Sequence, residues 1–191
     1  MTADPLRILS DDRAHAASLR DPLRDRCFLA TVNEDGNPEV RTLVLRDVEG
    51  CMGIFANGSS PKCQQVGNSS TVSILMYFES IGVQYRVQTE LRPMATEIVQ
   101  EMWQKRPDVS KKLDYLYETF PQSSSARNRE QLLSLLEEMP VPRVAPMTAK
   151  GFYFEPVHSV ERLLLDQSDG LHVRTLFERV EESWRAQQIV P

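Results

Sequence analysis

The chain has 191 residues, of which 41% are hydrophobic and 26% are charged, and a net charge of −5. A chain of this length and composition can bury its core without metal or disulfide support, and its negative charge argues against nucleic acid or an anionic membrane as a partner. Three irregularly spaced cysteines without a CxxC pair, no apolar run of membrane-spanning length and no apolar signal core near the first residue predict a cytoplasmic protein with reduced thiols and no membrane partner.

Strand patterns dominate the first half of the chain. A short helix is expected first, from an N-cap at Ser10 to about Leu19. Strands are then expected at residues 27–33, 39–48, 51–57, 71–78 and 83–91. A small helix interrupts them at residues 59–68, where serines precede Pro61. The segment 71–78 is apolar on both faces, which predicts a central strand.

Helical periodicity follows, and strand character then returns. The helices are expected at residues 94–106, 108–120 and 128–139, and the later strands at 151–157, 160–166 and 171–178. A loop with three prolines spans 139–149, and a hairpin turn is expected at 167–170. Closely spaced strands without alternating helices predict an antiparallel barrel of the α+β, mainly β class. The last strands should pair with the first group, because an uncovered edge invites aggregation.

Several common site motifs are absent. Neither a GxGxxG sequence nor a P-loop occurs, and no GxSxG elbow is present. The three histidines, His15, His158 and His172, are far apart in sequence and form no HxxxH pair, so we expect no metal site.

The stretch VRTLVLR, residues 40–46, places one arginine on each face of a predicted strand, namely Arg41 and Arg46. A cation among apolar neighbours is costly unless it is paired, and a phosphate is a suitable bidentate partner. The alternative is that both arginines lie at strand ends and pair with surface acids such as Asp47.

From about Asp21 to Pro191 the chain resembles the pyridoxamine 5'-phosphate oxidase family, the FMN-binding split β-barrel proteins. The similarity is carried by five segments in order: FLATVNEDGNPEVRTLVLR, FANGSSPK, VQYRV, PQSS and LHVR. The resemblance implies an antiparallel split β-barrel with flanking helices, FMN as cofactor, and a homodimer with FMN at its interface. It implies one FMN-binding domain over 1–191, with a helical arm at 1–20, a helical insertion at 94–138 and C-terminal strands at 151–191.

The resemblance also implies the residues that contact the cofactor, with Arg41 reaching the FMN phosphate. The implied cofactor-binding set is Arg41, Thr42, Leu43, Val44, Ser60, Lys62, Gln84, Gln122, Ser123 and Arg174. The chain departs from the family at Pro61, where the family has an arginine. Leucines 163–165 occupy the region of a tryptophan that packs on the flavin.

On the substrate side the resemblance is less complete. The implied substrate-binding set is Arg46, Arg106, Ser110 and His172, and His172 is also the candidate catalytic residue, orienting the substrate. In the family the residues at the positions of Arg46, Arg106 and Ser110 reach the substrate phosphate. Met102 replaces a tyrosine, and Gly170 replaces an arginine that covers the pyridine ring.

Three functions are compatible with these residues. The first is an FMN-dependent oxidoreductase that acts on a small, perhaps phosphorylated substrate; no general base is obvious, which fits direct hydride transfer to the flavin. The second is a non-catalytic protein that binds FMN or a ligand like pyridoxal phosphate. The third is a split-barrel protein that uses another cofactor, such as haem or a deazaflavin.

Overall fold

The computed structural model describes residues 4–68 and 71–191, and over these residues it contains nine strands and five α-helices. The strands are β1 (Arg26–Val32), β2 (Pro38–Val44), β3 (Arg46–Val48), β4 (Cys51–Asn57), β5 (Thr71–Phe78), β6 (Val83–Pro93), β7 (Ala149–Leu164), β8 (Val173–Val180) and β9 (Ser183–Ile189). The helices are α1 (Pro5–Ser18), α2 (Pro61–Asn68), α3 (Thr96–Gln104), α4 (Asp108–Thr119) and α5 (Arg129–Glu138), with a 3₁₀ turn η1 (Glu79–Ile81).

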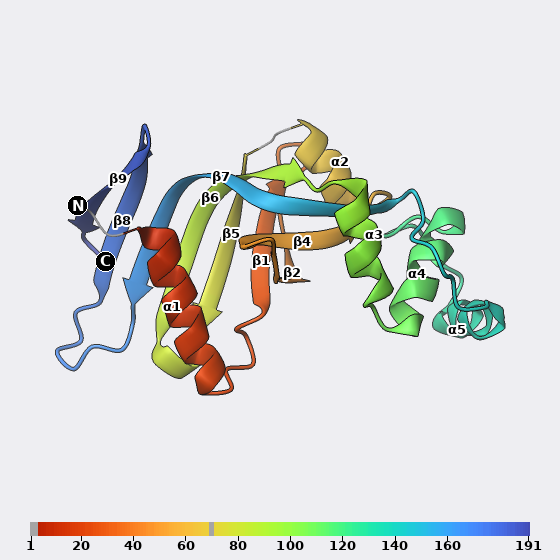
Figure 1. Ribbon diagram of the computed structural model, residues 1–191, viewed down its shortest axis with the longest axis horizontal. Coiled ribbons are helices and arrows are strands. Elements are labelled where there is room, and N and C mark those ends of the chain that lie inside the picture. The colour runs from red at the N-terminus through yellow and green to blue at the C-terminus, as the bar shows by residue number, and fades with distance from the viewer. Residues whose placement is uncertain (1–3, 69–70) are drawn as a thin grey trace.

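The strands form one antiparallel sheet in the order β2-β1-β5-β6-β7-β4-β3, and β8 and β9 extend it from β7. Figure 1 shows that the sheet curls into an open barrel, with the β8–β9 hairpin at one end and α3, α4 and α5 gathered at the other. The expected fold class, an α+β, mainly β antiparallel split barrel with flanking helices, is confirmed. Over the same residues, none of the helices combines the length and apolar character that a bilayer crossing requires.

A row of buried apolar side chains runs across five adjacent strands on the inner face of the sheet. Leu29 lies opposite Ile74, and Val87 lies between Ile74 and Val160. Phe177 of β8 continues the row, and all five side chains are buried. Because side chains paired across strands project to the same face, this row forms the centre of the hydrophobic core.

Two expected boundaries are wrong. Helix α1 begins at Pro5 instead of near Ser10, because the Asp4 carboxylate caps it by accepting the N–H of Leu6 at 3.0 Å. The expected strand 39–48 is divided at Leu45, which is fully buried and donates its N–H to the Asp25 carbonyl at 3.0 Å. Strand β2 therefore pairs with β1, whereas β3 turns to pair with β4.

The C-terminal strands also differ from the expectation. The segments 151–157 and 160–166 belong to one strand, β7, of 16 residues. Strand β9 was not expected at all, because its sequence SWRAQQI is mostly polar and mostly exposed. The predicted turn at 167–170 is present, with the Gly170 N–H donating to the Gln167 carbonyl at 3.0 Å.

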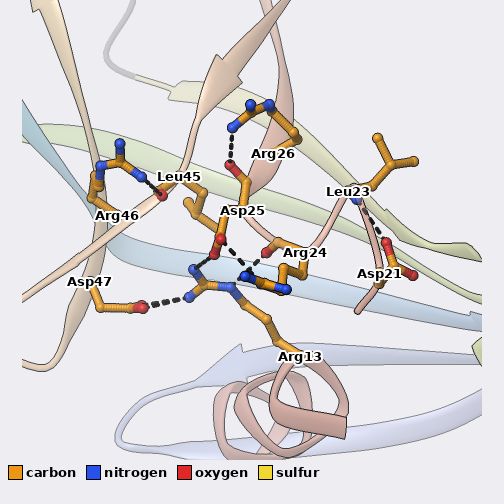
Figure 2. Close-up of polar contacts among 9 residues, drawn as sticks. All are labelled: Arg13, Asp21, Leu23, Arg24, Asp25, Arg26, Leu45, Arg46 and Asp47. Atoms are coloured by element: carbon orange, nitrogen blue, oxygen red, sulfur yellow. Dashed lines mark hydrogen bonds and ion pairs between the residues drawn. The ribbon is translucent and has the colours of Figure 1, made fainter. Parts of the chain in front are cut away.

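The guanidinium of Arg13 fastens α1 to the sheet (Figure 2). Its Nη1 donates to both carboxylate oxygens of Asp47 at 2.7 Å, and its Nη2 donates to Asp25 at 2.8 Å. Its Nε donates to the Arg24 carbonyl at 2.8 Å. All three nitrogens are used, so this one side chain joins α1 to β3 and to the segment that leads into β1.

We expect Gly53→Ala to destabilise the fold by roughly 1–3 kcal/mol, in the range for overpacking a core. A Cβ at Gly53 would lie 2.5 Å from the Phe152 carbonyl oxygen and 2.5 Å from the Met94 methyl. The matched control is Gly67→Ala in α2, where nothing lies within 4 Å, so that helix propensity should make the change neutral or stabilising by up to about 1 kcal/mol. Urea unfolding of both variants measures the difference, and equal effects would contradict this account of the β4–β7 contact.

Candidate functional site

Arg41 points from the middle of β2 to the inner face of the sheet, because it lies opposite the buried Leu29. Its Nη1 donates to the Thr31 hydroxyl at 2.5 Å, and its Nη2 donates to the Gln65 amide oxygen at 3.2 Å. Nη2 also donates to the Glu39 carboxylate at 2.9 Å. These bonds fix the guanidinium beside α2, and 22% of the side chain remains exposed.

Lys62 of α2 is a second cation close to Arg41. Burial lowers the pKa of the Lys62 ammonium; the nearby Cys63 opposes this shift, and the charge of Arg41 adds to it. Its Nζ lies 3.5 Å from the Gln122 amide oxygen, and within the described residues it forms no ion pair with a carboxylate. Lys62 is therefore a partly desolvated cation next to another cation, an arrangement that an anion would stabilise.

The loop between β4 and α2 holds the neighbouring polar groups in place. The Asn57 side-chain oxygen accepts the N–H and the hydroxyl of Ser59 at 2.9 and 2.7 Å. The Ser59 hydroxyl in turn accepts the N–H of Gln122 at 3.2 Å. Ser60 is buried and donates its hydroxyl to the Cys63 sulfur at 3.4 Å. The structure thus brings Arg41, Lys62, Ser60 and Gln122 of the predicted set together; we call these four residues the cation cluster.

The neighbours of the cation cluster in the sequence lie on both faces of the sheet. Leu43 packs against the hydrophobic core, whereas Thr42 and Val44 are exposed on the outer face. Ser123, which follows Gln122, is exposed and has a positive φ of 73°. The strand alternation therefore separates these residues from one another within one chain.

Gln84 and Arg174 form a second group on the outer face of the sheet. Both lie opposite Leu163 of β7, so their side chains share a face across three strands. Strands β1 and β5 separate this group from β2, and Arg41 projects from the other face. One chain alone does not bring the second group to the cation cluster.

The guanidinium of Arg174 is held by a nearly buried carboxylate. Its Nε and Nη2 donate to the two oxygens of Glu161 at 2.8 and 3.0 Å, and Arg86 also forms an ion pair with Glu161. Burial raises the pKa of the Glu161 carboxyl, but the hydrogen bonds and charges of Arg174 and Arg86 outweigh it, so the pKa is lowered. Glu161 lines, with Phe28 and Leu176, a hollow of about 990 Å³ on the outer face.

His172, the candidate catalytic residue, is exposed and lies one residue before β8, outside the strand in which the sequence placed it. Gly170 lies in the preceding turn with a positive φ of 75°, and an added Cβ would meet nothing within 4 Å. His172 therefore lies in the exposed connection that leads into β8, two residues before Arg174.

The predicted substrate residues are dispersed. Arg46 on β3 is exposed and donates only a long bond of 3.5 Å to the Leu45 carbonyl (Figure 2). Arg106 donates to the buried Asp114 at 2.5 Å, and Ser110 lies half-buried in the first turn of α4. The alternative, pairing with surface acids, is met in part: Arg41 forms an ion pair with Glu39 of its own strand, whereas Asp47 is paired with Arg13 and, within the described residues, with neither Arg41 nor Arg46.

Three polar residues of these groups were missed in the sequence, namely Gln65, Asp114 and Glu161. Gln65 lies three residues after Lys62 in α2, a spacing that puts both on neighbouring positions of one helix face and could have indicated it. Asp114 and Glu161 contact arginines that the sequence pattern does not connect to them. Within the part of the chain that the structure describes, no group of three His, Cys, Asp or Glu residues is arranged to hold a metal ion.

Comparisons with known proteins relate the chain to one family and one fold. Residues 12–94 match the family model described as pyridoxamine 5'-phosphate oxidase, FMN-binding domain. The chain is 28% identical, over its whole length and 91% of the relative, to a pyridoxine/pyridoxamine 5'-phosphate oxidase of Pseudoalteromonas atlantica.

Two solved structures share the fold. PhzG from Burkholderia lata, solved with tetrahydrophenazine-1-carboxylic acid, is 23% identical with a TM-score of 0.86, covering 100% of this chain and 94% of that one. A pyridoxamine 5'-phosphate oxidase-related, FMN-binding protein from Nostoc punctiforme is 23% identical with a TM-score of 0.80, and both chains are covered completely. At these identities the likeness shows the fold alone.

We expect Glu161→Gln to destabilise the protein by about 1–3 kcal/mol at neutral pH, the range for hydrogen bonds to charged groups. Because the folded-state pKa of Glu161 is lowered, the stabilisation is present above the unfolded-state pKa and is lost as the pH falls through the folded-state pKa. The difference between wild type and variant should therefore shrink below pH 4.5, the ordinary value of this carboxyl.

The control is Glu178→Gln. It removes an exposed ion pair between Glu178 of β8 and Arg185 of β9, and it should lower the free energy of unfolding by at most about 1 kcal/mol. Urea unfolding from about pH 3 to about pH 8, a range that brackets the ordinary pKa of 4.5 for this carboxyl, measures both variants. A difference for Glu161→Gln that does not change with pH would contradict the assigned charge state.

Proposed function

The chain belongs to the pyridoxamine 5'-phosphate oxidase-like family of split β-barrel proteins, and from that premise we propose that it is an FMN-dependent oxidoreductase acting on a small substrate, phosphorylated or not. One observation carries the proposal. Lys62 is partly desolvated, lies near Arg41 and forms no ion pair with a carboxylate within the described residues.

The donors of the cation cluster fit the phosphate of FMN. Arg41 and Lys62 supply two cations against the single carboxylate of Glu39, so the local charge is positive. The amide oxygen of Gln122 lies 3.5 Å from the Lys62 ammonium, and Ser60, whose hydroxyl donates to Cys63, comes two residues before Lys62. A phosphate would relieve the repulsion between the two cations and restore an ordinary pKa to Lys62.

In this proposal the second group contacts the flavin ring. Gln84 and Arg174 donate to it, and Thr42, Leu43, Val44 and Ser123 line the cofactor. FMN, when bound, supplies the two-electron redox chemistry, and the chain supplies orientation and charge. His172 orients the substrate from the exposed connection before β8, and Arg46, Arg106 and Ser110 contact the substrate.

A homodimer would complete the cofactor site. The cation cluster and the second group lie on opposite faces of one sheet, so one FMN reaches both only if a second copy contributes one of them. The outer face, with its hollow of about 990 Å³ and exposed Val40, is suited to meet another copy.

The alternative function is a non-catalytic FMN- or pyridoxal phosphate-binding protein of the same fold. Gly170 favours it, since an exposed glycine turn supplies no side chain to cover a substrate ring. The visible spectrum of the purified protein separates the two functions. Flavin absorption that candidate amines or alcohols bleach without oxygen supports the oxidoreductase, whereas flavin absorption that none of them bleaches supports the binding protein.

We expect Arg41→Ala to weaken FMN binding by roughly 2–3 kcal/mol, the range for a lost hydrogen bond to a charged group. Riboflavin, which lacks the phosphate, should bind the variant and the wild type with similar affinity. Fluorescence titration of the apoprotein with each flavin measures both constants. If the variant loses affinity for both flavins equally, Arg41 acts through the fold of β1, β2 and α2 instead of through the phosphate.

We also expect the FMN-loaded protein to sediment as a dimer, with about twice the chain mass of 21.8 kDa. The reason is that each cofactor site needs residues from both faces of the sheet. Sedimentation equilibrium across a concentration series tests this. A monomer that still binds one FMN per chain would contradict the shared site.

A further inference from the structure

Asp114 on α4 forms a buried ion pair with one of the predicted substrate arginines. Its Oδ2 accepts a hydrogen bond from Arg106 Nη1 at 2.5 Å and another from Trp103 Nε1 at 2.8 Å. The Asp114 side chain is 4% exposed, whereas that of Arg106 is 34% exposed. The Arg106 side chain therefore remains partly exposed, while the buried Asp114 carboxylate compensates its positive charge.

The ion pair with the permanently charged guanidinium of Arg106 favours the ionised form of Asp114. Both groups that contact Oδ2 are donors, so the oxygen acts only as an acceptor. Burial raises the pKa of Asp114 above its ordinary value, and the charge of Arg106 and the hydrogen bonds of Trp103 and Asn57 oppose this rise without cancelling it. Asn57 also joins α4 to the loop between β4 and α2, by donating its side-chain N–H to the Asp114 backbone carbonyl at 3.4 Å.

Arg106 lies between α3 and α4, and the two lysines of α4 contact groups other than the Asp114 carboxylate. Lys111 lies over the Trp103 ring, 5.5 Å from its centroid, and Lys112 donates to the Leu136 carbonyl at 2.8 Å. The pair of Arg106 and Asp114 is thus close to neutral overall. The cation cluster differs, because Arg41 and Lys62 together have only Glu39 as a counter-charge.

We propose that Asp114 sets the charge selectivity of the substrate subsite at Arg106, so that this subsite takes a neutral or singly charged polar group and rejects a phosphate dianion. Arg106 can still donate through its exposed nitrogens, but a dianion placed there would face the ionised carboxylate behind it. This inference rests on the proposed function, since it assigns the substrate class of the same site.

The test is Asp114→Asn in the FMN-loaded protein, titrated calorimetrically with pyridoxine 5'-phosphate and with pyridoxine. Asparagine keeps one acceptor oxygen for the Trp103 N–H, removes the negative charge and replaces the other carboxylate oxygen with an NH2 donor. The wild type should bind pyridoxine at least threefold more tightly than pyridoxine 5'-phosphate. The variant should bind pyridoxine 5'-phosphate at least tenfold more tightly than the wild type does, with its affinity for pyridoxine within threefold.

The matched control is Asp108→Asn, which removes the same charge from an exposed position in the first turn of α4. It should leave both affinities within threefold of wild type. Equal affinities of wild type and Asp114→Asn for the phosphorylated ligand, including no binding to either, would overturn the proposal. Tenfold tighter binding of pyridoxine 5'-phosphate than of pyridoxine by the wild type would also overturn the proposal. This comparison needs no variant, so it tests the proposal even if Asp114→Asn does not fold.

The proposed function is judged separately. A purified wild type without flavin affinity would refute the oxidoreductase and leave the charge selectivity to be measured on the apoprotein with the same two ligands. Flavin binding and substrate bleaching with no effect of Asp114→Asn would refute only the selectivity.

Discussion

The fold depends on one strand that belongs to two parts of the barrel. β7 has 16 residues and pairs with β6 on one side, and on its other side with β4 near its start and with β8 near its end. The β6–β7 register shifts near Thr89, and such an irregularity bends a strand and adds to the ordinary twist of the sheet. The Thr89 hydroxyl, fully buried, donates to the Pro156 carbonyl at 3.0 Å, so the irregular region is hydrogen-bonded and the sheet can close around its core.

That closure determines where the site residues lie. One face of the sheet is filled by the apolar row that includes Leu29 and Val160, and the other face stays open. Arg41 reaches the closed side at the end of the barrel where α2 covers it, whereas Arg174 stands on the open side beside Glu161. Strand alternation thus separates charged groups that one ligand could use together, and the separation gives a physical reason for two copies to share a site.

The sequence predicted the parts of the fold that carry a local pattern. Alternating apolar residues and Asp-Gly or Gly-containing turns gave most strands, and the serine–proline start of α2 gave that helix. Strand β9 was not predicted, because its polar sequence has no strand pattern and it is held in the sheet by its pairing with β8. The site followed the same rule: Arg41 and Lys62 were predicted from a resemblance in short motifs, but Gln65 and Glu161 depend on contacts between segments distant in the sequence.

Charge compensation is the part of a site that a motif describes least well. Arg41 and Arg106 are the same residue type, and each has a carboxylate partner, Glu39 or Asp114. The difference lies in what surrounds each pair. Lys62 adds a second, partly desolvated cation beside Arg41. Asp114, in contrast, is buried behind Arg106. The two lysines of α4 contact Trp103 and the Leu136 carbonyl instead of the Asp114 carboxylate. Because an anion responds to the net charge and the burial of its surroundings, two arginines from one family pattern can favour ligands of different charge.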